Sequence, residues 1–95
     1  MKQAKNEHAV LVELAIRNDC VSCEQARSQI EDFILNVPGV NLRTYDLDND
    51  FFIPKEKQSV ITPAVWIAGS LCSLGMLDMN NFRKKIEQQK QFTNE

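Results

Sequence analysis

Residues 9–16 read AVLVELAI, residues 17–19 read RND, and residues 20–23 read CVSC. The first stretch is nearly continuous in apolar residues, which is typical of a central strand covered on both faces. Residues 24–37 carry apolar side chains at helical spacing. We therefore expect Cys20 and Cys23 at the junction where a strand passes into a helix, and the unpaired N–H groups of a helix start favour a thiolate there.

The apolar stripe of the expected helix distinguishes the two cysteines. It comprises Cys23, Ala26, Ile30, Phe33, Ile34 and Val37. Cys23 therefore belongs to the buried face, whereas Cys20 precedes the regular turn and faces the exposed rim. In thiol chemistry the exposed sulfur is expected to attack and the buried one to resolve. Pro38-Gly39 ends the helix.

The rest of the chain predicts a second strand, a hairpin and a last helix. Residues 40–47 form a strand that pairs in parallel with residues 9–16 through a right-handed crossover. Residues 51–59, interrupted by Pro54, predict one or two helical turns. Residues 64–68 and 70–74 predict an antiparallel hairpin around Gly69.

Asp78 is the expected N-cap of the final helix. Leu77, Phe82 and Ile86, with Gln89 as a weaker member, define the inward face of this helix. From Gln88 onward the chain is polar, and we expect it to fray.

Composition bounds the class of protein. The chain has 95 residues, 43% of them apolar, so we expect residues 1–95 to form one domain. Its net charge is −2, so we expect no electrostatic attraction to nucleic acid or to an anionic membrane. No segment reaches the roughly 18 consecutive apolar residues that span a bilayer. Arg17-Asn18-Asp19 precedes Cys20 where a lipoprotein signal needs small residues, so we expect a cytoplasmic protein.

Three cysteines are an odd number, which argues against a purely structural disulfide framework. In a reducing compartment the C-x-x-C spacing indicates redox catalysis or metal binding. His8, the only histidine, is either an exposed residue or a metal ligand. Residues 46–50 resemble the start of a calcium loop, but Phe51 stands where glycine is needed and Lys57 where glutamate is needed. We expect a solvated turn there, and neither a cofactor nor a resident metal.

The expected order of elements is βαβ, a short helical piece, a ββ hairpin and a helix. With C-x-x-C at the first junction and an X-Pro pair opening the third strand, this order resembles the thioredoxin superfamily in its small, glutaredoxin-sized form. The likeness runs from about residue 9 to residue 86. CVSC at 20–23 stands at the redox motif, TPAVWI at 62–67 resembles the cis-proline strand, and LGMLD at 74–78 resembles the glycine turn before the last helix.

The resemblance implies a fold and a reaction. The fold is a three-layer α/β arrangement, βαβ-αββα, in which helices flank a four-stranded mixed sheet. The reaction is thiol–disulfide exchange with a protein substrate, in which Cys20 attacks and Cys23 resolves, as in small thioredoxin-like redox-active disulfide proteins. A cis peptide at Thr62–Pro63 would face Cys20, the Thr62 backbone would pair with an extended substrate, and Gly75 would complete the substrate-binding surface. The implied partners are a disulfide-containing client protein and an upstream reductase or glutathione.

The motif departs from both main signatures of the family. Val21-Ser22 fills it where thioredoxins carry Gly-Pro and glutaredoxins carry Pro-Tyr or Pro-Phe, and Met76 follows Gly75 where glutaredoxins carry a second glycine. Asp19 opposes the effect of the helix start on the Cys20 pKa. We expect the pKa of the Cys20 thiol to be less depressed than in a strongly oxidising relative, and the reduction potential of the motif to suit a reductant.

Two further residues leave alternatives open. Glu13 interrupts the apolar strand, so its carboxylate either points to an open edge or serves proton transfer near the thiols. Cys72 is either a semi-buried free thiol or a third redox partner.

Two rival functions remain. Copper-chaperone-like metal-binding modules also place C-x-x-C between a first strand and a first helix, although they lack the hairpin and closing helix expected here. The other rival is a redox-inactive interaction domain whose thiols are incidental.

Overall fold

The structure, a computed structural model, describes residues 9–93, with side chains described through residue 90. The elements along the chain are β1 (Val10–Ile16), α2 (Val21–Leu35), β2 (Val40–Asp46), the single 3-10 turn η1 (Lys55–Lys57), β3 (Ala64–Ile67), β4 (Ser70–Leu74) and α3 (Met79–Thr93). The predicted order of strands and helices is confirmed. His8 lies outside the described residues, so its two alternatives stay predictions.

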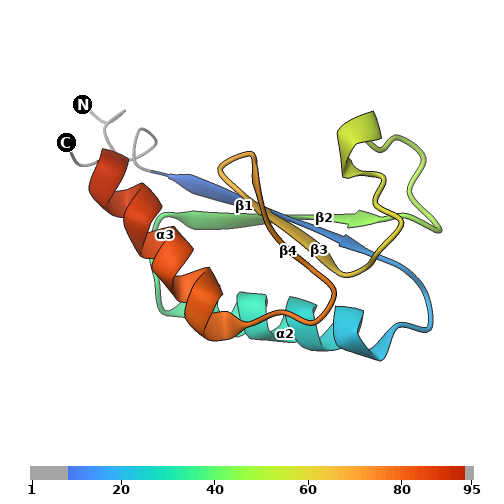
Figure 1. The fold of residues 1–95 in the computed structure, drawn as a ribbon, viewed down its shortest axis with the longest axis horizontal. Coiled ribbons are helices and arrows are strands. Elements are labelled where there is room, and N and C mark those ends of the chain that lie inside the picture. The colour runs from blue at the N-terminus through green and yellow to red at the C-terminus, as the bar shows by residue number, and fades with distance from the viewer. Residues whose placement is uncertain (1–8, 94–95) are drawn as a thin grey trace.

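The four strands form one mixed sheet in the order β2-β1-β3-β4 (Figure 1). β1 pairs with β2 in parallel and with β3 antiparallel, and β3 pairs antiparallel with β4. β1 is thus a central strand, as its apolar run predicts. The chain is a small α/β domain with a four-stranded mixed sheet and two helices.

Alternation along β1 divides the sheet into two faces. Val10, Val12, Leu14 and Ile16 join the main core, which also takes side chains from both α2 and α3. On the second face a smaller cluster contains Ala15, Ala64 and Trp66. Figure 1 shows the two long helices on one side of the sheet and η1 on the other.

The expectation of helices flanking the sheet in three layers was therefore wrong in its outer layer. Both long helices cover one face, and the second face is covered by η1 and its adjoining loops. The reason is local. The segment after β2 contains Pro54, which disfavours a helix interior, and it forms only one 3-10 turn that begins directly after this proline.

Helix α2 begins at Val21, inside the C-x-x-C motif, which agrees with the predicted junction of strand and helix. Cys20, with extended backbone (φ −124°), is its N-cap, and Asn36 is its C-cap before Pro38 and Gly39. Cys23, Ala26 and Ile30 of the predicted stripe are buried, and the remaining three members pack partly buried against the same core. The junction of strand, cap and helix thus forms where the sequence predicts it.

The β3–β4 hairpin turns at two residues, Ala68 and Gly69, both with positive φ (51° and 85°). A two-residue hairpin turn of this kind matches the twist of the flanking strands. A glycine adopts this conformation readily, whereas Ala68 does so against its intrinsic preference.

The last helix confirms one prediction and corrects another. Asp78 Oδ1 accepts the backbone N–H of Asn80 at 3.0 Å, which is an N-cap bond. The expected fraying from Gln88 was wrong, because α3 continues to Thr93. Lys90 Nζ donates to the Pro38 carbonyl at 2.9 Å, which ties this polar turn to the end of the α2–β2 loop.

Across residues 9–93, neither helix is long and apolar enough to cross a bilayer.

Candidate redox site

The two thiols of the C-x-x-C motif form a disulfide at the start of α2. The Cα atoms of Cys20 and Cys23 lie 5.2 Å apart, within the ordinary range for a disulfide. Cys20 is partly exposed at the N-cap, whereas Cys23 is completely buried in the main core. The difference in exposure predicted from the helical stripe is confirmed.

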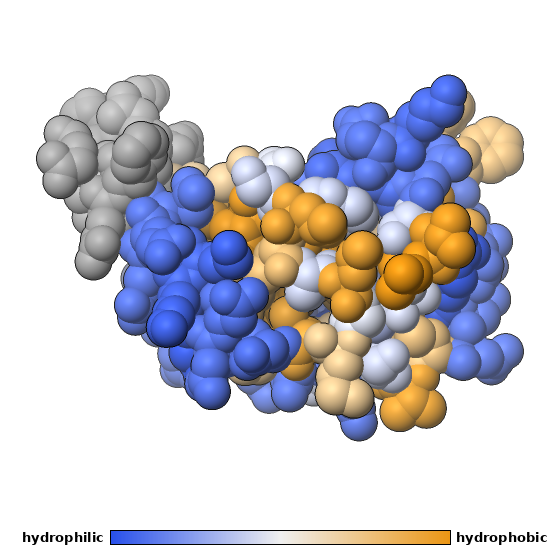
Figure 2. Space-filling view, viewed as in Figure 1, coloured by the Kyte–Doolittle hydropathy of each residue, from blue (hydrophilic) through white to orange (hydrophobic). Residues whose placement is uncertain are grey.

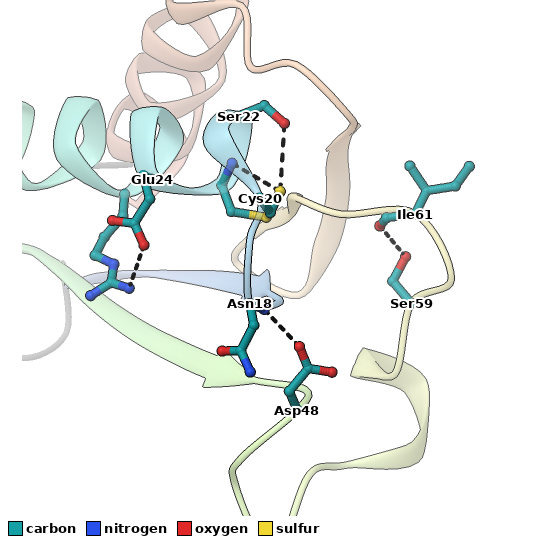
Figure 3. The surroundings of a disulfide bond; sticks show 9 residues. Asn18, Cys20, Ser22, Glu24, Asp48, Ser59 and Ile61 are labelled. Atoms are coloured by element: carbon teal, nitrogen blue, oxygen red, sulfur yellow. Dashed lines mark hydrogen bonds and ion pairs between the residues drawn. A yellow bond between two sulfur atoms is a disulfide. The ribbon is translucent and has the colours of Figure 1, made fainter.

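Two polar groups approach the Cys20 sulfur (Figure 3). The backbone N–H of Cys23 donates to Cys20 Sγ at 3.2 Å. The Ser22 hydroxyl lies 3.6 Å from the same sulfur and is the donor in the disulfide state, because a disulfide sulfur carries no proton. Both groups can stabilise the negative charge of a Cys20 thiolate after reduction. Ser22 was not predicted as a site residue, although its place inside the motif was a usable signal.

The turn before Cys20 is held by the loop that follows β2. The backbone N–H of Asn18 donates to Asp48 Oδ2 at 2.6 Å (Figure 3). Arg17 Nη1 lies 3.4 Å from Asp48 Oδ1. Asn49 Nδ2 donates to Asn18 Oδ1 at 3.1 Å. Asp19 is exposed and takes a positive φ of 55°, which lets the chain reverse into the cap. Two loops that are distant in sequence therefore fix the position of the motif.

The predicted solvated turn at residues 46–50 is confirmed. Asp46 Oδ1 accepts the backbone N–H groups of Asp48 and Asn49 at 3.1 and 3.2 Å. The hydrogen bond from the Asn49 side chain, with these backbone bonds, holds the pKa of Asp46 below its usual range. No three His, Cys, Asp or Glu side chains gather into a metal-binding group within the part of the chain that the structure describes.

The predicted substrate-binding residues belong to two segments that contact each other. The Thr62–Pro63 peptide is cis, as the resemblance implies, and Pro63 is buried. The N–H of Gly75 donates to the Pro63 carbonyl at 2.7 Å, which joins the two segments directly. Gly75 has φ 84°, a conformation that suits glycine. Figure 3 shows that the loop segment with Ser59 and Ile61 passes beside Cys20.

Four exposed apolar side chains, which we call the apolar rim, belong to the segments around the disulfide. They are Val21 (74% exposed), Val60 (91%), Ile61 (52%) and Met76 (79%). Figure 2 shows that apolar surface gathers on this face between the hydrophilic surfaces of α3 and of η1. Exposed apolar side chains in one region are typical of a surface that contacts a partner. The apolar rim was not predicted from the sequence, because its residues come from three separate segments and none of them forms a local pattern.

Glu13 is not brought to the thiols. It lies on the second face of the sheet, while Cys23 packs in the core on the helix face. It does not point to an open edge either, because it is only 8% exposed and bonds Tyr45 and Lys57. Both alternatives drawn from the sequence were therefore wrong. The carboxylate is satisfied by partners from β2 and η1 that the strand pattern did not reveal.

Cys72 is a partly buried free thiol on β4 that packs against the main core. Burial raises the pKa of this thiol above its usual value of 9.0, and the nearby charge of Lys85 offsets part of the effect. Cys72 is therefore a weaker nucleophile at neutral pH than an exposed cysteine.

We expect Cys72 in a Cys20→Ser/Cys23→Ser variant to react slowly with iodoacetamide at pH 8, because a raised pKa leaves less thiolate at any given pH. Its rate should still be rising above pH 9. The same variant unfolded in denaturant is the control, and its rate should level off at lower pH. A folded-state rate that levels off at or below the unfolded one would contradict the assignment.

A groove of about 610 Å³ lies between the later part of α2 and the start of α3, lined by Phe33, Val37 and Arg83 among others. It belongs to the opposite end of α2 from Cys20. Neither cysteine of the disulfide lines this groove.

No family model matches the sequence, and no curated protein sequence matches it. Among solved structures, the chain is similar to the crystal structure of a protein of unknown function from Staphylococcus aureus, with 13% identity and a TM-score of 0.56. The match covers 92% of this chain and 94% of that one. The likeness extends over the whole domain and concerns its fold alone.

Proposed function

We propose that this chain is a thioredoxin-like thiol–disulfide oxidoreductase that exchanges its Cys20–Cys23 dithiol with a disulfide in a client protein. One observation carries the proposal. A disulfide spans the N-cap and first turn of α2, and one of its cysteines is accessible while the other is completely buried. This asymmetry is what a two-step exchange requires, because the attacking and resolving sulfurs must not compete for the client.

The exchange takes two steps, in which each S–S bond that forms replaces one that breaks. In the reduced protein the Cys20 thiolate attacks a client disulfide, an intermolecular S–S bond forms, and one client thiolate leaves. The Cys23 thiolate then attacks Cys20 Sγ, the mixed disulfide breaks, and the second client thiolate leaves. Two electrons pass to the client, and the two departing thiolates take up protons from solvent according to their pKa values. An upstream reductase or glutathione supplies two electrons to restore the dithiol.

The groups around Cys20 support this chemistry. The Cys23 N–H and the Ser22 hydroxyl approach the Cys20 sulfur, which attacks the client disulfide and is then itself attacked by Cys23. Thr62 and Gly75 belong to adjoining segments beside the motif, where a client backbone could be received. The element order and the position of the motif favour the thioredoxin-like assignment, and a reducing cytoplasm is the compartment that we propose for it.

A copper-chaperone-like metal site is the rival outcome. Cu(I) held by both thiolates would need Cys23 to be available as a ligand that can exchange with a partner. Its complete burial in the core favours the redox reading.

Insulin reduction coupled to dithiothreitol tests the proposal. Wild-type protein is expected to accelerate precipitation of the insulin B chain, and Cys20→Ser is expected to fall to the uncatalysed rate because the attacking sulfur is gone. Cys72→Ser is the matched control and should keep wild-type activity. Tight binding of one Cu(I) by a wild-type protein that reduces no disulfide would replace the redox proposal with the metal-binding one.

A further inference from the structure

A buried polar cluster lies on the second face of the sheet, away from the thiols. Lys57 Nζ lies 3.2 Å from Glu13 Oε1, and the Tyr45 hydroxyl donates to Glu13 Oε2 at 2.7 Å. Glu13 is 8% exposed and Lys57 7%. The Lys57 ammonium also lies 4.6 Å from the centre of the Trp66 ring. Both carboxylate oxygens and the ammonium therefore have partners, which buried charges require.

The hydroxyl of Tyr45 is held in its donor form. Burial and the hydrogen bond to Glu13 raise the pKa of Tyr45, and Arg43 offsets part of the effect. The tyrosine therefore donates to the carboxylate throughout the neutral range, and the ion pair has a fixed orientation on the sheet.

Lys57 is also the start of the segment that reaches the redox site. Residues 58–63 belong to no strand or helix, so few backbone bonds hold them. The Ser59 N–H donates to the Lys57 carbonyl at 3.0 Å, and Arg17 Nη2 donates to the Ser59 carbonyl at 3.1 Å. Val60 and Ile61 are exposed, so apolar burial does little to hold the segment.

We propose that the Glu13–Lys57 ion pair is a positioning device that anchors residues 57–63 to the sheet and thereby places Thr62 and Pro63 beside Cys20 for client binding. This inference rests on the proposed exchange function. The ion pair fixes the near end of the segment, Arg17 fixes Ser59, and Gly75 fixes Pro63. Without the ion pair, Arg17 and Gly75 still bind Ser59 and Pro63, but the point at which the segment leaves the sheet is no longer fixed.

The anchor predicts an effect on client binding that is separate from thiol reactivity. Glu13 and Lys57 lie with Trp66 on the second face of the sheet, so their removal should leave the Cys20 nucleophile as it is. A misplaced binding segment weakens capture of the client, which raises KM more than it lowers kcat.

The test compares Lys57→Met with the charge-free double variant Glu13→Gln/Lys57→Met. The single variant leaves a buried carboxylate without its partner and should lose stability, whereas the double variant removes both charges and should recover most of it. In the double variant we expect KM for a protein disulfide to rise about tenfold, with kcat changed by less than about twofold. The pH profile of Cys20 alkylation should match that of the wild type, and the Ser59 amide should exchange its hydrogen at least about tenfold faster.

Two control variants separate anchoring from general destabilisation. Ile86→Ala removes core packing from α3 and should lower stability with KM unchanged. Lys57→Arg keeps the positive charge, so its KM should lie closer to the wild-type value than the KM of Lys57→Met. A wild-type KM and wild-type Ser59 exchange in the double variant would overturn the anchor. A shifted pH profile of Cys20 alkylation would overturn it too, in favour of a direct effect on the thiol.

Failure of the proposed function has a different signature. If the wild-type protein reduces no disulfide, the exchange proposal is wrong, whereas the Ser59 exchange rates still decide whether the ion pair holds the segment.

Discussion

Replacing Cys23 with serine is expected to turn the protein into a trap that stays covalently joined to its client. Cys20 is the accessible sulfur, so it still attacks and forms the mixed disulfide. The completely buried Cys23 is the sulfur that would release the client, and serine cannot perform that step. The complex should accumulate on a non-reducing gel after incubation with a disulfide-containing client, and catalytic turnover should fall to the level that added thiol alone sustains.

Two variants check that the trapped bond is at Cys20. Cys20→Ser should give no complex, because a buried Cys23 cannot reach a client. Cys23→Ser/Cys72→Ser should trap as much as Cys23→Ser alone, because Cys72 takes no part in release. Equal trapping by Cys20→Ser and Cys23→Ser would mean that both sulfurs are accessible to a client, and the assignment of roles would be wrong.

The position of the C-x-x-C motif and the unequal exposure of its cysteines could be predicted from the sequence because their determinants are local. The spacing from Cys23 through Ala26 to Ile30 is the helical period itself, so it assigns a face without knowledge of any other element. The same holds for Asp78, whose side chain caps the helix that begins one residue later.

The second face of the sheet could not be predicted in the same way. Lys57 is the clearest case, because a lysine on a short polar turn is ordinarily exposed, yet it is buried here between Glu13 and Trp66. Its burial depends on two side chains from β1 and β3, and no local pattern encodes where η1 lies over the sheet. The same long-range contacts explain why Glu13 binds Tyr45 and Lys57 on this face and does not approach the thiols.

The expectation of long helices on both faces of the sheet was wrong for a related reason. Periodicity predicts which residues of a helix face inward, but it does not say which side of the sheet the helix covers. Phe82 and Ile86 were correctly expected to face inward, and they meet the same core as Ile30 of α2. Both long helices thus share one face of the sheet.

Phe82→Ala is expected to bring the protein close to unfolding. Phe82 is completely buried, and its ring packs edge-on against Phe33 with centroids 5.3 Å apart, which joins α3 to α2. Truncating a buried phenylalanine costs about 3–5 kcal/mol, against a total stability of about 5–15 kcal/mol for a small domain. In a domain of this size each kcal/mol is worth roughly 4–8 °C, so thermal unfolding should shift downward by roughly 12–40 °C.

Phe51→Ala is the matched control, because the side chain removed and the ring geometry are the same. Phe51 also packs edge-on against a second phenylalanine, Phe52, at 5.4 Å, but it is 92% exposed. An exposed pair loses little when one ring is removed, so the change should stay within about 0.5 kcal/mol. Comparable losses in the two variants, measured by thermal unfolding of the oxidised protein, would mean that the α2–α3 contact does not stabilise the domain. A large loss confined to Phe82→Ala would show that burial in the helix-side core, and not the aromatic pair alone, holds α3 against α2, the helix that carries the Cys20–Cys23 disulfide.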